Sequence, residues 1–171
     1  VPNVEPYVRV PLGSGPRHFD FHPDGRHAYV VNELNSTVTT FSYDGSTGGL
    51  TDLQTLSTVP SDFGGVNYPA DLHVHPSGKF LYASNRGHDS IAIFRIDQLT
   101  HELTHITNEH TGGENPRNFT IDPTGEFVVV GNQDSNTVVS FRIDQKSGVL
   151  KATGRQVSVP SPACHKFAPS V

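Results

Sequence analysis

The amino-acid sequence predicts an all-β protein, because its composition, its turn residues and its internal repetition all favour short strands. The 171 residues include 16 glycines and 13 prolines, and most apolar residues are Val, Ile, Leu, Phe or Tyr. β-Branched and aromatic residues favour strands, whereas Gly and Pro favour the tight turns between them. With 34% hydrophobic residues, the chain is long enough to enclose a core. We therefore expect one domain over residues 1–171.

A repeated pattern of prolines divides the chain into units. Pro16 is followed seven residues later by Pro-Asp-Gly, and Pro69 and Pro116 are followed at the same spacing by Pro-Ser-Gly and Pro-Thr-Gly. Further positions recur at a constant distance from these prolines, namely Asn32, Asn85, Asn132, Phe41, Phe94 and Phe141, and a leucine after turn residues closes each unit at Leu50, Leu103 and Leu150. The first prolines are 53 and 47 residues apart, close to the period of about 40 to 50 residues of β-propeller blades.

Each unit is predicted to form one propeller blade. Residues 17–22 and 27–31 alternate or run apolar around the Pro-Asp-Gly turn, which is typical of a β-hairpin. Residues 38–43 and 53–57 supply a third and a fourth strand, and a four-stranded antiparallel sheet with its core on both faces is a blade. We assign the units approximately to residues 16–68, 69–115 and 116–161, with the start of a closing blade at 162–171.

The number of units falls short of a closed ring. A period of about 50 residues divides the chain into about three and a half blades, whereas closed propellers have about four to eight. An open arc would expose apolar blade faces to water. We therefore expect a missing N-terminal half or a second chain to supply the remaining blades, and a first residue other than Met agrees with removal of upstream sequence.

Charge and cysteine content narrow the range of partners. The formal net charge is −5 and no basic run is present, so we expect no nucleic-acid partner. No stretch approaches the roughly 18 apolar residues of a membrane span, and the first residues do not resemble a signal peptide. The single cysteine, Cys164, cannot form an internal disulfide, which favours a cytoplasmic protein. We expect Cys164 to be a small buried residue.

Comparison of equivalent positions separates scaffold from candidate site. Positions shared by all units are expected to serve the blade, and the three asparagines are expected to bond to turn backbone. The hairpin folded about Asp24-Gly25 places Arg17 opposite Asn32 and Glu33. The same folding pairs Asp71 with Asn85 and Arg86, and Arg117 with Asn132 and Gln133. The candidate row is therefore Glu33, Arg86 and Gln133, facing a second row of Arg17, Ala70 and Arg117, where blades converge on the channel.

These residue types suit an anionic substrate. Guanidinium groups bind carboxylate or phosphate in a bidentate manner, and a carboxylate can activate water. We predict catalytic roles for Glu33, Arg17 and Arg86. Substrate-binding roles are predicted for His18, which lies beside Arg17, and for Asp71, His73, Arg117 and Gln133. A structural ion pair between Arg17 and Glu33 is the alternative interpretation.

The ten histidines are scattered along the chain. His22 and His75 occupy equivalent positions before the turn proline, so we interpret both as structural. His73 and His75 could share a strand face and hold a metal, but no third ligand with suitable spacing accompanies them. We therefore predict neither a metal nor a cofactor.

Several motifs resemble those of the seven-bladed propeller lactonases, which include propeller-type 6-phosphogluconolactonases and fungal 3-carboxy-cis,cis-muconate lactonizing enzymes. The motifs are GPRH at 15–18, VNELNST at 31–37, ADLH at 70–73, SNRG at 84–87 and NPRNF at 115–119. The resemblance extends from about Gly13 to the end and implies the C-terminal half of such a propeller, with residues 159–164 near the family's C-terminus. It also implies that Arg17, Glu33 and Arg86 line the active site together with a histidine upstream of Val1.

The resemblance implies hydrolysis of a small anionic sugar lactone, for which 6-phosphogluconolactone is the leading candidate. Water would attack the carbonyl with Glu33 or the upstream histidine as base, while Arg17 or Arg86 stabilises the oxyanion or holds phosphate. A carboxymuconate cycloisomerase is an alternative, as is a non-catalytic propeller that acts as a binding scaffold, because fold alone does not imply activity.

Overall fold

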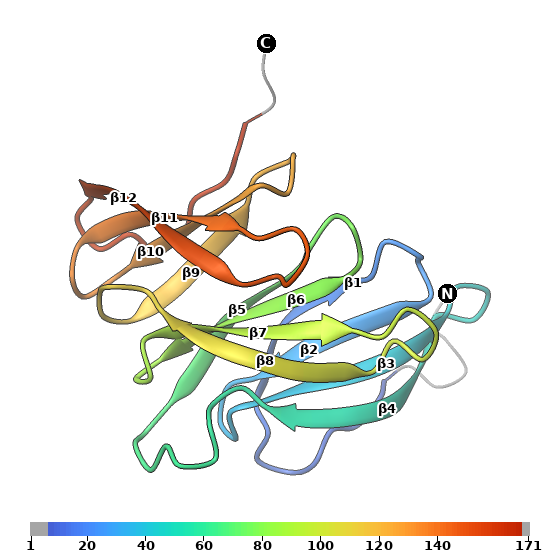
Figure 1. Cartoon of the computed structure of the whole chain (residues 1–171). Helices are drawn as coiled ribbons and strands as arrows, with labels where there is room; N and C mark the ends of the chain where they lie inside the picture. Colours follow the sequence, from blue (N-terminus) through green and yellow to red (C-terminus); the bar gives the residue numbers. More distant parts are fainter. Residues whose placement is uncertain (1–6, 169–171) are drawn as a thin grey trace.

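The computed structural model describes residues 7–168, which form three four-stranded antiparallel sheets (Figure 1). The first sheet contains β1 (Pro16–Phe21), β2 (His27–Asn32), β3 (Thr37–Asp44) and β4 (Gly49–Ser57). The second contains β5 (Tyr68–Val74), β6 (Phe80–Arg86), β7 (Ser90–Ile96) and β8 (Leu103–His110). The third contains β9 (Pro116–Ile121), β10 (Phe127–Asn132), β11 (Thr137–Ile143) and β12 (Leu150–Ser158).

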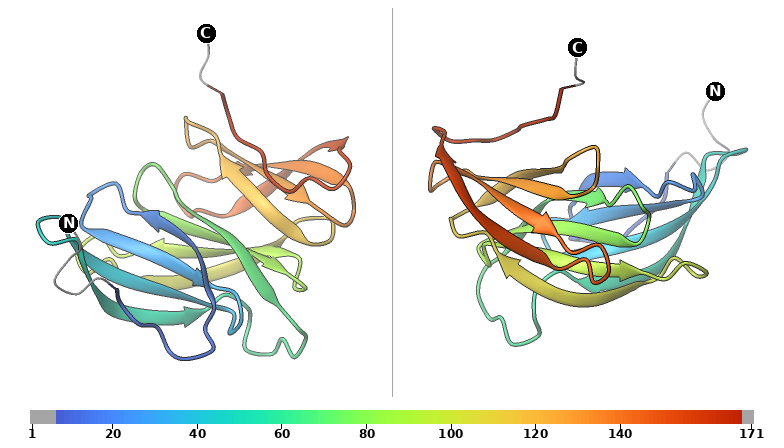
Figure 2. Two further views of the ribbon diagram at one scale, coloured as in Figure 1. Left: turned by 180° about the vertical axis from the view of Figure 1, so that it is seen from behind. Right: turned by 45° about the horizontal axis from the view of Figure 1, so that its top comes forward.

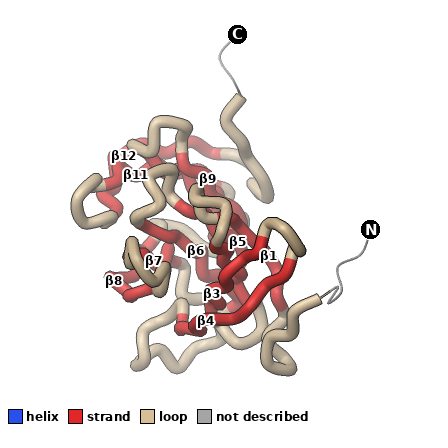
Figure 3. Tube along the Cα trace, turned by 90° about the vertical axis from the view of Figure 1, so that its right-hand side faces the viewer, coloured by secondary structure: helices blue, strands red, loops and turns tan. Residues whose placement is uncertain are grey.

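The predicted all-β class and four-stranded units are confirmed. Within each sheet the strands lie side by side in chain order, and the sheets fan out from the side on which β1, β5 and β9 are neighbours (Figures 2 and 3). We call the three sheets blades 1, 2 and 3, with β1, β5 and β9 as their innermost strands. No helix capable of crossing a membrane occurs between residues 7 and 168.

Two details of the predicted boundaries are wrong. Leu50, Leu103 and Leu150 do not close the units; each lies at or next to the first residue of an outermost strand. Leu103 and Leu150 are nearly inaccessible to solvent and belong to the cores between blades. The predicted closing blade begins no strand within residues 162–168, and Pro169 lies outside the described residues.

The core lies between blades, and the central blade is buried on both faces. Along β6, Leu81 and Ala83 pack against blade 1, while Phe80 and Tyr82 pack against blade 3. This division follows from the strand period of two, which points successive side chains to opposite faces. Full burial of a large apolar side chain such as Leu81 or Phe80 stabilises the fold by about 1.5 to 3 kcal/mol.

A repeated histidine link joins the turns of consecutive blades. His22 Nε2 lies 3.0 Å from the Gly78 carbonyl oxygen, and His75 Nε2 lies 2.8 Å from that of Gly125. Both glycines have positive φ, and a Cβ atom at either position would come within 2.8 Å of the histidine ring. The Gly in each Pro-x-Gly turn therefore accommodates both the turn and the preceding blade's histidine, which confirms the structural interpretation of His22 and His75.

The three repeated asparagines are scaffold residues, as predicted. Asn85 Nδ2 donates to the Thr58 carbonyl oxygen at 2.8 Å, and Asn132 Nδ2 donates to that of Thr111 at 3.3 Å, so each ties its blade to the segment before it. Asn32 differs from the prediction because its Nδ2 donates to threonine hydroxyls on β3 rather than to turn backbone.

Candidate active site

A β-bulge near the start of each innermost strand presents the first row of candidate residues. Arg17 has no partner in the ladder between β1 and β2, and Ala70 and Arg117 occupy the equivalent bulges in blades 2 and 3. Pro16, next to Arg17, pairs with Asn32, so the predicted neighbourhood of Arg17 is confirmed. A bulge redirects side chains and is common beside active sites.

The predicted position of Asp71 is wrong by one residue. Sequence folding placed Asp71 opposite Asn85 and Arg86, but Pro69 is the residue that pairs with Asn85. Leu72 pairs with Ala83, so the register counted from the turn places Asp71 beside Ser84, and its backbone N–H donates to Ser84 Oγ at 3.0 Å. Asp71 therefore lies deeper along β5 than predicted.

Glu33 joins the two arginines that were assigned catalytic roles. Its Oε1 contacts Arg86 Nη2 and lies 3.6 Å from Arg17 Nε. Arg17 Nη1 also donates to the Ala70 carbonyl oxygen, which crosses from blade 1 to blade 2. The Glu33 side chain is 31% exposed, so the carboxylate remains in contact with solvent. The three residues form a bridged ion pair between neighbouring blades.

The surroundings of Arg17 are electrostatically crowded. Burial lowers the pKa of its guanidinium, and the charge of Arg86 lowers it further, while Glu33 acts in the opposite direction. Arg117 adds a third positive charge to the same surroundings. An anionic ligand would relieve this repulsion between arginines, whereas a cation would increase it.

His18 and Asp71 form a second pair directly beside Arg17. His18 Nδ1 lies 2.5 Å from Asp71 Oδ1, and Arg17 Nη1 lies 3.2 Å from His18 Nε2. The two contacts agree with a neutral imidazole that donates from Nδ1 and accepts at Nε2. Glu33, Arg17, His18 and Asp71 therefore form one continuous polar chain across β1 and β5.

The Asp71 carboxylate is buried and has many donors. It accepts hydrogen bonds from the backbone N–H groups of Leu72 and Phe119 and from Asn118 Nδ2. His73 Nε2 lies 3.3 Å from Asp71 Oδ2. Burial alone would raise the pKa of Asp71, but the neighbouring His73 and His18 outweigh it and hold this pKa below its usual value. Asp71 is therefore an anion that orients the histidines around it.

A cavity of about 240 Å³ opens beside this pair, and its lining includes His18, Asp20, Asp71 and His73. Burial raises the pKa of Asp20, although its carboxylate accepts a hydrogen bond from the Val74 backbone N–H at 2.8 Å. Cys164 also lines this cavity and is exposed, so its predicted burial is wrong. The final described segment contacts blade 3, where His165 Nε2 lies 2.8 Å from the Val129 carbonyl oxygen.

The remaining predicted positions lie on blade 3. The folded hairpin placed Arg117 opposite Asn132, but Pro116 is the residue that pairs with Asn132, and Arg117 occupies the bulge. The Gln133 backbone N–H donates to the Asn115 carbonyl oxygen at 2.9 Å, and Gln133 Oε1 is buried without a hydrogen-bond partner among the residues described. The equivalent candidate positions of the three blades therefore lie at the same end of their sheets. The ion-pair contacts join Glu33 to Arg86 and Arg17, which lie on blades 1 and 2.

Sequence reasoning missed Asn118 and Lys166. Asn118 is the third-blade equivalent of His18 and Asp71; its Nδ2 donates to Asp71, and its Oδ1 accepts from the His165 backbone N–H at 2.9 Å. Unequal side chains at equivalent positions were the available signal for Asn118. Lys166 lines the cavity from the last segment, and counted from Pro162 it is the equivalent of Asp20 and His73, which line the same cavity.

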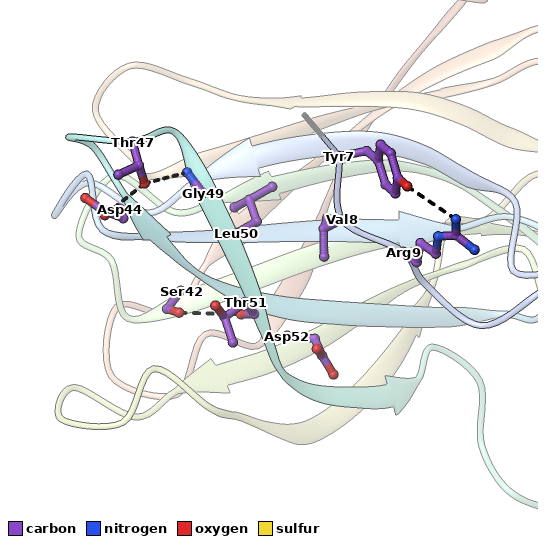
Figure 4. A pocket seen from close by; sticks show the side chains of 10 residues that line it. All are labelled: Tyr7, Val8, Arg9, Ser42, Asp44, Thr47, Gly49, Leu50, Thr51 and Asp52. Carbon is purple, nitrogen blue, oxygen red and sulfur yellow. Dashed lines mark hydrogen bonds between the residues drawn. The ribbon is translucent and has the colours of Figure 1, made fainter. Parts of the chain in front are cut away.

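A larger hollow of about 670 Å³ lies elsewhere, between the segment Tyr7–Arg9 and strands β3 and β4 (Figure 4). Asp44 accepts a hydrogen bond from Thr47 there. None of the candidate catalytic residues lines this hollow. We therefore place the candidate site at the bulged ends of the innermost strands.

Comparison with known proteins identifies the family. Residues 2–167 match the family model described as lactonase, 7-bladed beta-propeller. The chain belongs to the seven-bladed β-propeller lactonase family. It is 40% identical over 155 residues to a 6-phosphogluconolactonase of Bacillus subtilis, a match that covers 91% of this chain and 44% of the relative. An uncharacterized protein of Lactococcus lactis is 46% identical over 111 residues, which cover 65% of this chain and 33% of that protein.

Solved structures of propeller lactonases agree with the fold. A periplasmic gluconolactonase of Pseudomonas aeruginosa superimposes with a TM-score of 0.85 and 38% identity, covering 90% of this chain and 42% of that one. A putative 6-phosphogluconolactonase of Bacteroides fragilis superimposes with a TM-score of 0.87 and 38% identity, covering 94% of this chain and 44% of that one. The chain thus spans less than half the length of these propeller lactonases.

Proposed function

We propose that the site around Glu33 opens a sugar lactone by hydrolysis and that its substrate is 6-phosphogluconolactone. The observation that carries this proposal is the bridge of Glu33 to Arg17 and Arg86, because it brings one carboxylate and two guanidinium groups together across two blades. The identity to a protein named 6-phosphogluconolactonase supports the choice of lactone. Phosphate also suits the positive charge that Arg17, Arg86 and Arg117 share.

The proposed chemistry requires a base and an oxyanion partner. Glu33 takes a proton from water, and the resulting hydroxide attacks the lactone carbonyl carbon. The guanidinium of Arg17 or Arg86 stabilises the negative charge that develops on the carbonyl oxygen. The ring C–O bond then breaks, and the proton held by Glu33 passes to the departing alkoxide, which becomes a hydroxyl group. The new carboxylic acid releases its own proton to solvent and becomes a carboxylate. His18, held by Asp71, orients Arg17 through the contact between His18 Nε2 and Arg17 Nη1.

Glu33→Gln is the primary test of this mechanism. The amide keeps the size of the side chain but cannot accept a proton, so we expect hydrolysis of 6-phosphogluconolactone to fall by about 10² to 10⁴ in kcat. Lactone opening is followed by titration of the acid released, after subtraction of the spontaneous rate. The matched control is Glu126→Gln, because Glu126 lies in an exposed ion pair with Arg142 on blade 3. Equal kcat values for Glu33→Gln and the control would exclude Glu33 as base.

Arg86→Ala tests the choice of substrate. The unphosphorylated gluconolactone serves as the comparison, because it lacks the group that we assign to the arginines. If Arg86 holds phosphate, the variant raises KM for the phosphorylated lactone and leaves KM for gluconolactone nearly unchanged. An equal change in the kinetic constants for both lactones would instead mean that Arg86 binds the lactone carbonyl oxygen. Turnover of carboxymuconate in place of either lactone would replace the proposal with cycloisomerase chemistry.

We also propose that further blades complete the ring in the active protein. The outer face of blade 1 carries Phe19 and Phe21, which are 43% and 45% exposed, and Phe21 lies 5.0 Å from the Tyr43 ring. The opposite end of the arc has a hollow of about 670 Å³ whose lining includes Phe127 and Val129. Apolar faces of this kind pack against neighbouring blades in a closed propeller.

The solution mass of the chain tests how the ring is completed. A particle of twice 18.6 kDa would mean that a second copy covers these faces. An 18.6 kDa monomer that binds an apolar dye would mean that the covering blades belong to additional polypeptide. A monomer without dye binding would contradict the proposal, because the faces would then need no cover.

A further inference from the structure

A cluster of histidines surrounds one carboxylate at the other end of blades 1 and 2. His22 and Asp24 flank the β1–β2 turn, His27 begins β2, and His101 lies in the turn between β7 and β8 of the neighbouring blade. One ligand-capable atom from each of His22, Asp24 and His101 lies within 4.8 Å of the others. Arg17 and Glu33 are at the opposite end of the strands, so this cluster is separate from the candidate active site.

The separations agree with the edges of a small coordination polyhedron. His22 Nδ1 lies 3.1 Å from Asp24 Oδ1, and His101 Nε2 lies 3.5 Å from Asp24 Oδ2. Zinc–ligand bonds of about 2.0 to 2.1 Å in a tetrahedron place neighbouring ligand atoms about 3.3 Å apart. The two histidines therefore lie at this distance from the Asp24 carboxylate, each from a different oxygen, and one ligand-capable atom of each of the three residues lies within 4.8 Å of the others.

Hydrogen bonds prepare two of these side chains for a metal. His22 Nε2 lies 3.0 Å from the Gly78 carbonyl oxygen and donates to it, which leaves the lone pair on Nδ1, the atom that faces Asp24. Nδ1 accepts from the Asp24 backbone N–H at 3.2 Å, and a bound metal would replace that hydrogen bond. His27 Nδ1 lies 2.8 Å from Asp24 Oδ2 and can orient the carboxylate. Metal-binding histidines and carboxylates characteristically have such outer partners.

The scaffold does not require this cluster, because the next interface is built without it. The blade 2–blade 3 equivalents of Asp24, His27 and His101 are Ser77, Phe80 and Gly148. Gly148 packs on the Phe80 ring. At the equivalent place between blades 1 and 2, the His101 ring stacks on the His27 ring with centroids 3.8 Å apart. Both turns also receive the same hydrogen bond, since Tyr29 donates to the His101 carbonyl oxygen and Tyr82 to that of Gly148. Serine, phenylalanine and glycine at these three positions therefore support the same packing between blades.

His101 is an unusual residue for its backbone position. Its φ is +59°, while Gly48 and Gly148, its equivalents in blades 1 and 3, have φ of +73° and +78°. This conformation is strained for a residue that carries a Cβ atom. His101 Nδ1 is buried without a hydrogen-bond partner in the described part of the chain, whereas Nε2 is the atom that faces Asp24. An imidazole that occupies a strained position held by glycine in the other blades is explained if its Nε2 binds a ligand.

We propose that His22, Asp24 and His101 bind a divalent transition-metal ion, with zinc as the natural choice. Three ligands of nitrogen and oxygen type with one open position suit Zn²⁺, and Co²⁺ accepts the same donor set. Two ligands come from blade 1 and one from blade 2, so the ion clamps the two blades together.

Metal titration of the 171-residue chain tests the proposal. The protein is first dialysed against a chelator and then against buffer without the chelator. We expect one Zn²⁺ per chain with a dissociation constant of about 1 µM or tighter, and a visible absorption spectrum of tetrahedral type with Co²⁺. His101→Gly should fold, because glycine occupies the equivalent turns, and should lose the cobalt spectrum together with at least tenfold in zinc affinity. His27→Phe copies Phe80 and should weaken zinc binding by about 10- to 100-fold through loss of the outer partner.

His105→Ala is the matched control, since His105 is an exposed histidine on β8 outside the cluster. This variant should keep the wild-type stoichiometry and spectrum. Zinc should raise the midpoint of thermal unfolding in the wild type and in His105→Ala but not in His101→Gly. Equal zinc affinity in the wild type and His101→Gly, or no stoichiometric zinc binding by the wild type, would overturn the proposal.

Discussion

Replacing Asp71 with asparagine removes the negative charge from a carboxylate that is only 2% exposed. The wild-type carboxylate accepts from His18 Nδ1 at 2.5 Å, Asn118 Nδ2 at 2.5 Å, Leu72 N at 3.0 Å and Phe119 N at 3.2 Å. Asparagine retains one acceptor oxygen and turns an NH₂ group toward the other donors. At least two of the four hydrogen bonds are therefore lost in Asp71→Asn.

The expected loss of stability follows from these contacts. A hydrogen bond to a charged group contributes about 1.5 to 3 kcal/mol, so losing two lowers the free energy of unfolding by about 3 to 6 kcal/mol at pH 7. That is a large part of the 5 to 15 kcal/mol that typically stabilises a domain. Urea unfolding of Asp71→Asn and wild type at pH 7 measures the difference, with Asp52→Asn as control because Asp52 is exposed on β4.

The pH dependence of this difference has a definite sign. His73 and His18 outweigh burial and hold the folded-state pKa of Asp71 below its ordinary value. The stabilisation is therefore fully present above the unfolded-state pKa of about 3.9 and is lost as pH falls toward the folded-state pKa. The difference between wild type and Asp71→Asn should shrink below about pH 4. A difference under about 1 kcal/mol at pH 7, or one that grows at pH 3, would refute this reasoning.

Three further substitutions test the scaffold by the same unfolding assay. Asn85→Ala removes bonds to the Thr58 carbonyl and hydroxyl groups and should cost about 2 to 3 kcal/mol; a cost below 0.5 kcal/mol would contradict the assigned role. Gly87→Ala places a Cβ 2.2 Å from the Val66 carbonyl oxygen at φ +109°, so we expect a loss of about 2 to 4 kcal/mol, and unchanged stability would disprove the close approach. Arg142→Ala breaks an exposed ion pair and should change stability by less than about 1 kcal/mol, whereas a larger loss would reveal a packing role.

Strand content and repeat frame could be predicted because both depend on local chemistry. Alternating apolar residues around Pro-x-Gly turns specify a hairpin wherever they occur, and three copies at similar spacing specify three similar sheets. The proximity of Arg17 to Glu33 followed from hairpin folding alone. The bulges at Arg17, Ala70 and Arg117 did not follow, because a bulge has no clear local signal in the sequence.

Contacts between blades could not be read from any single hairpin. The link between Arg86 and Glu33 joins residues 53 positions apart and depends on how blade 2 lies against blade 1. The exposure of Cys164 depends on the path of the last segment, which the repeat does not specify. The gathering of His22, Asp24 and His101 likewise requires two turns from different blades to meet.

The sequence by itself determined the all-β class, the blade repeat and the positions at which equivalent residues differ, because these depend on side-chain periodicity and turn conformation within about 50 residues. The tertiary structure decided which of those unequal residues touch. Packing of one blade on the next brought Arg86 to Glu33, Asp71 to His18 and His101 to Asp24. Side-chain chemistry is encoded residue by residue, but proximity across an interface is a property of the packed sheets.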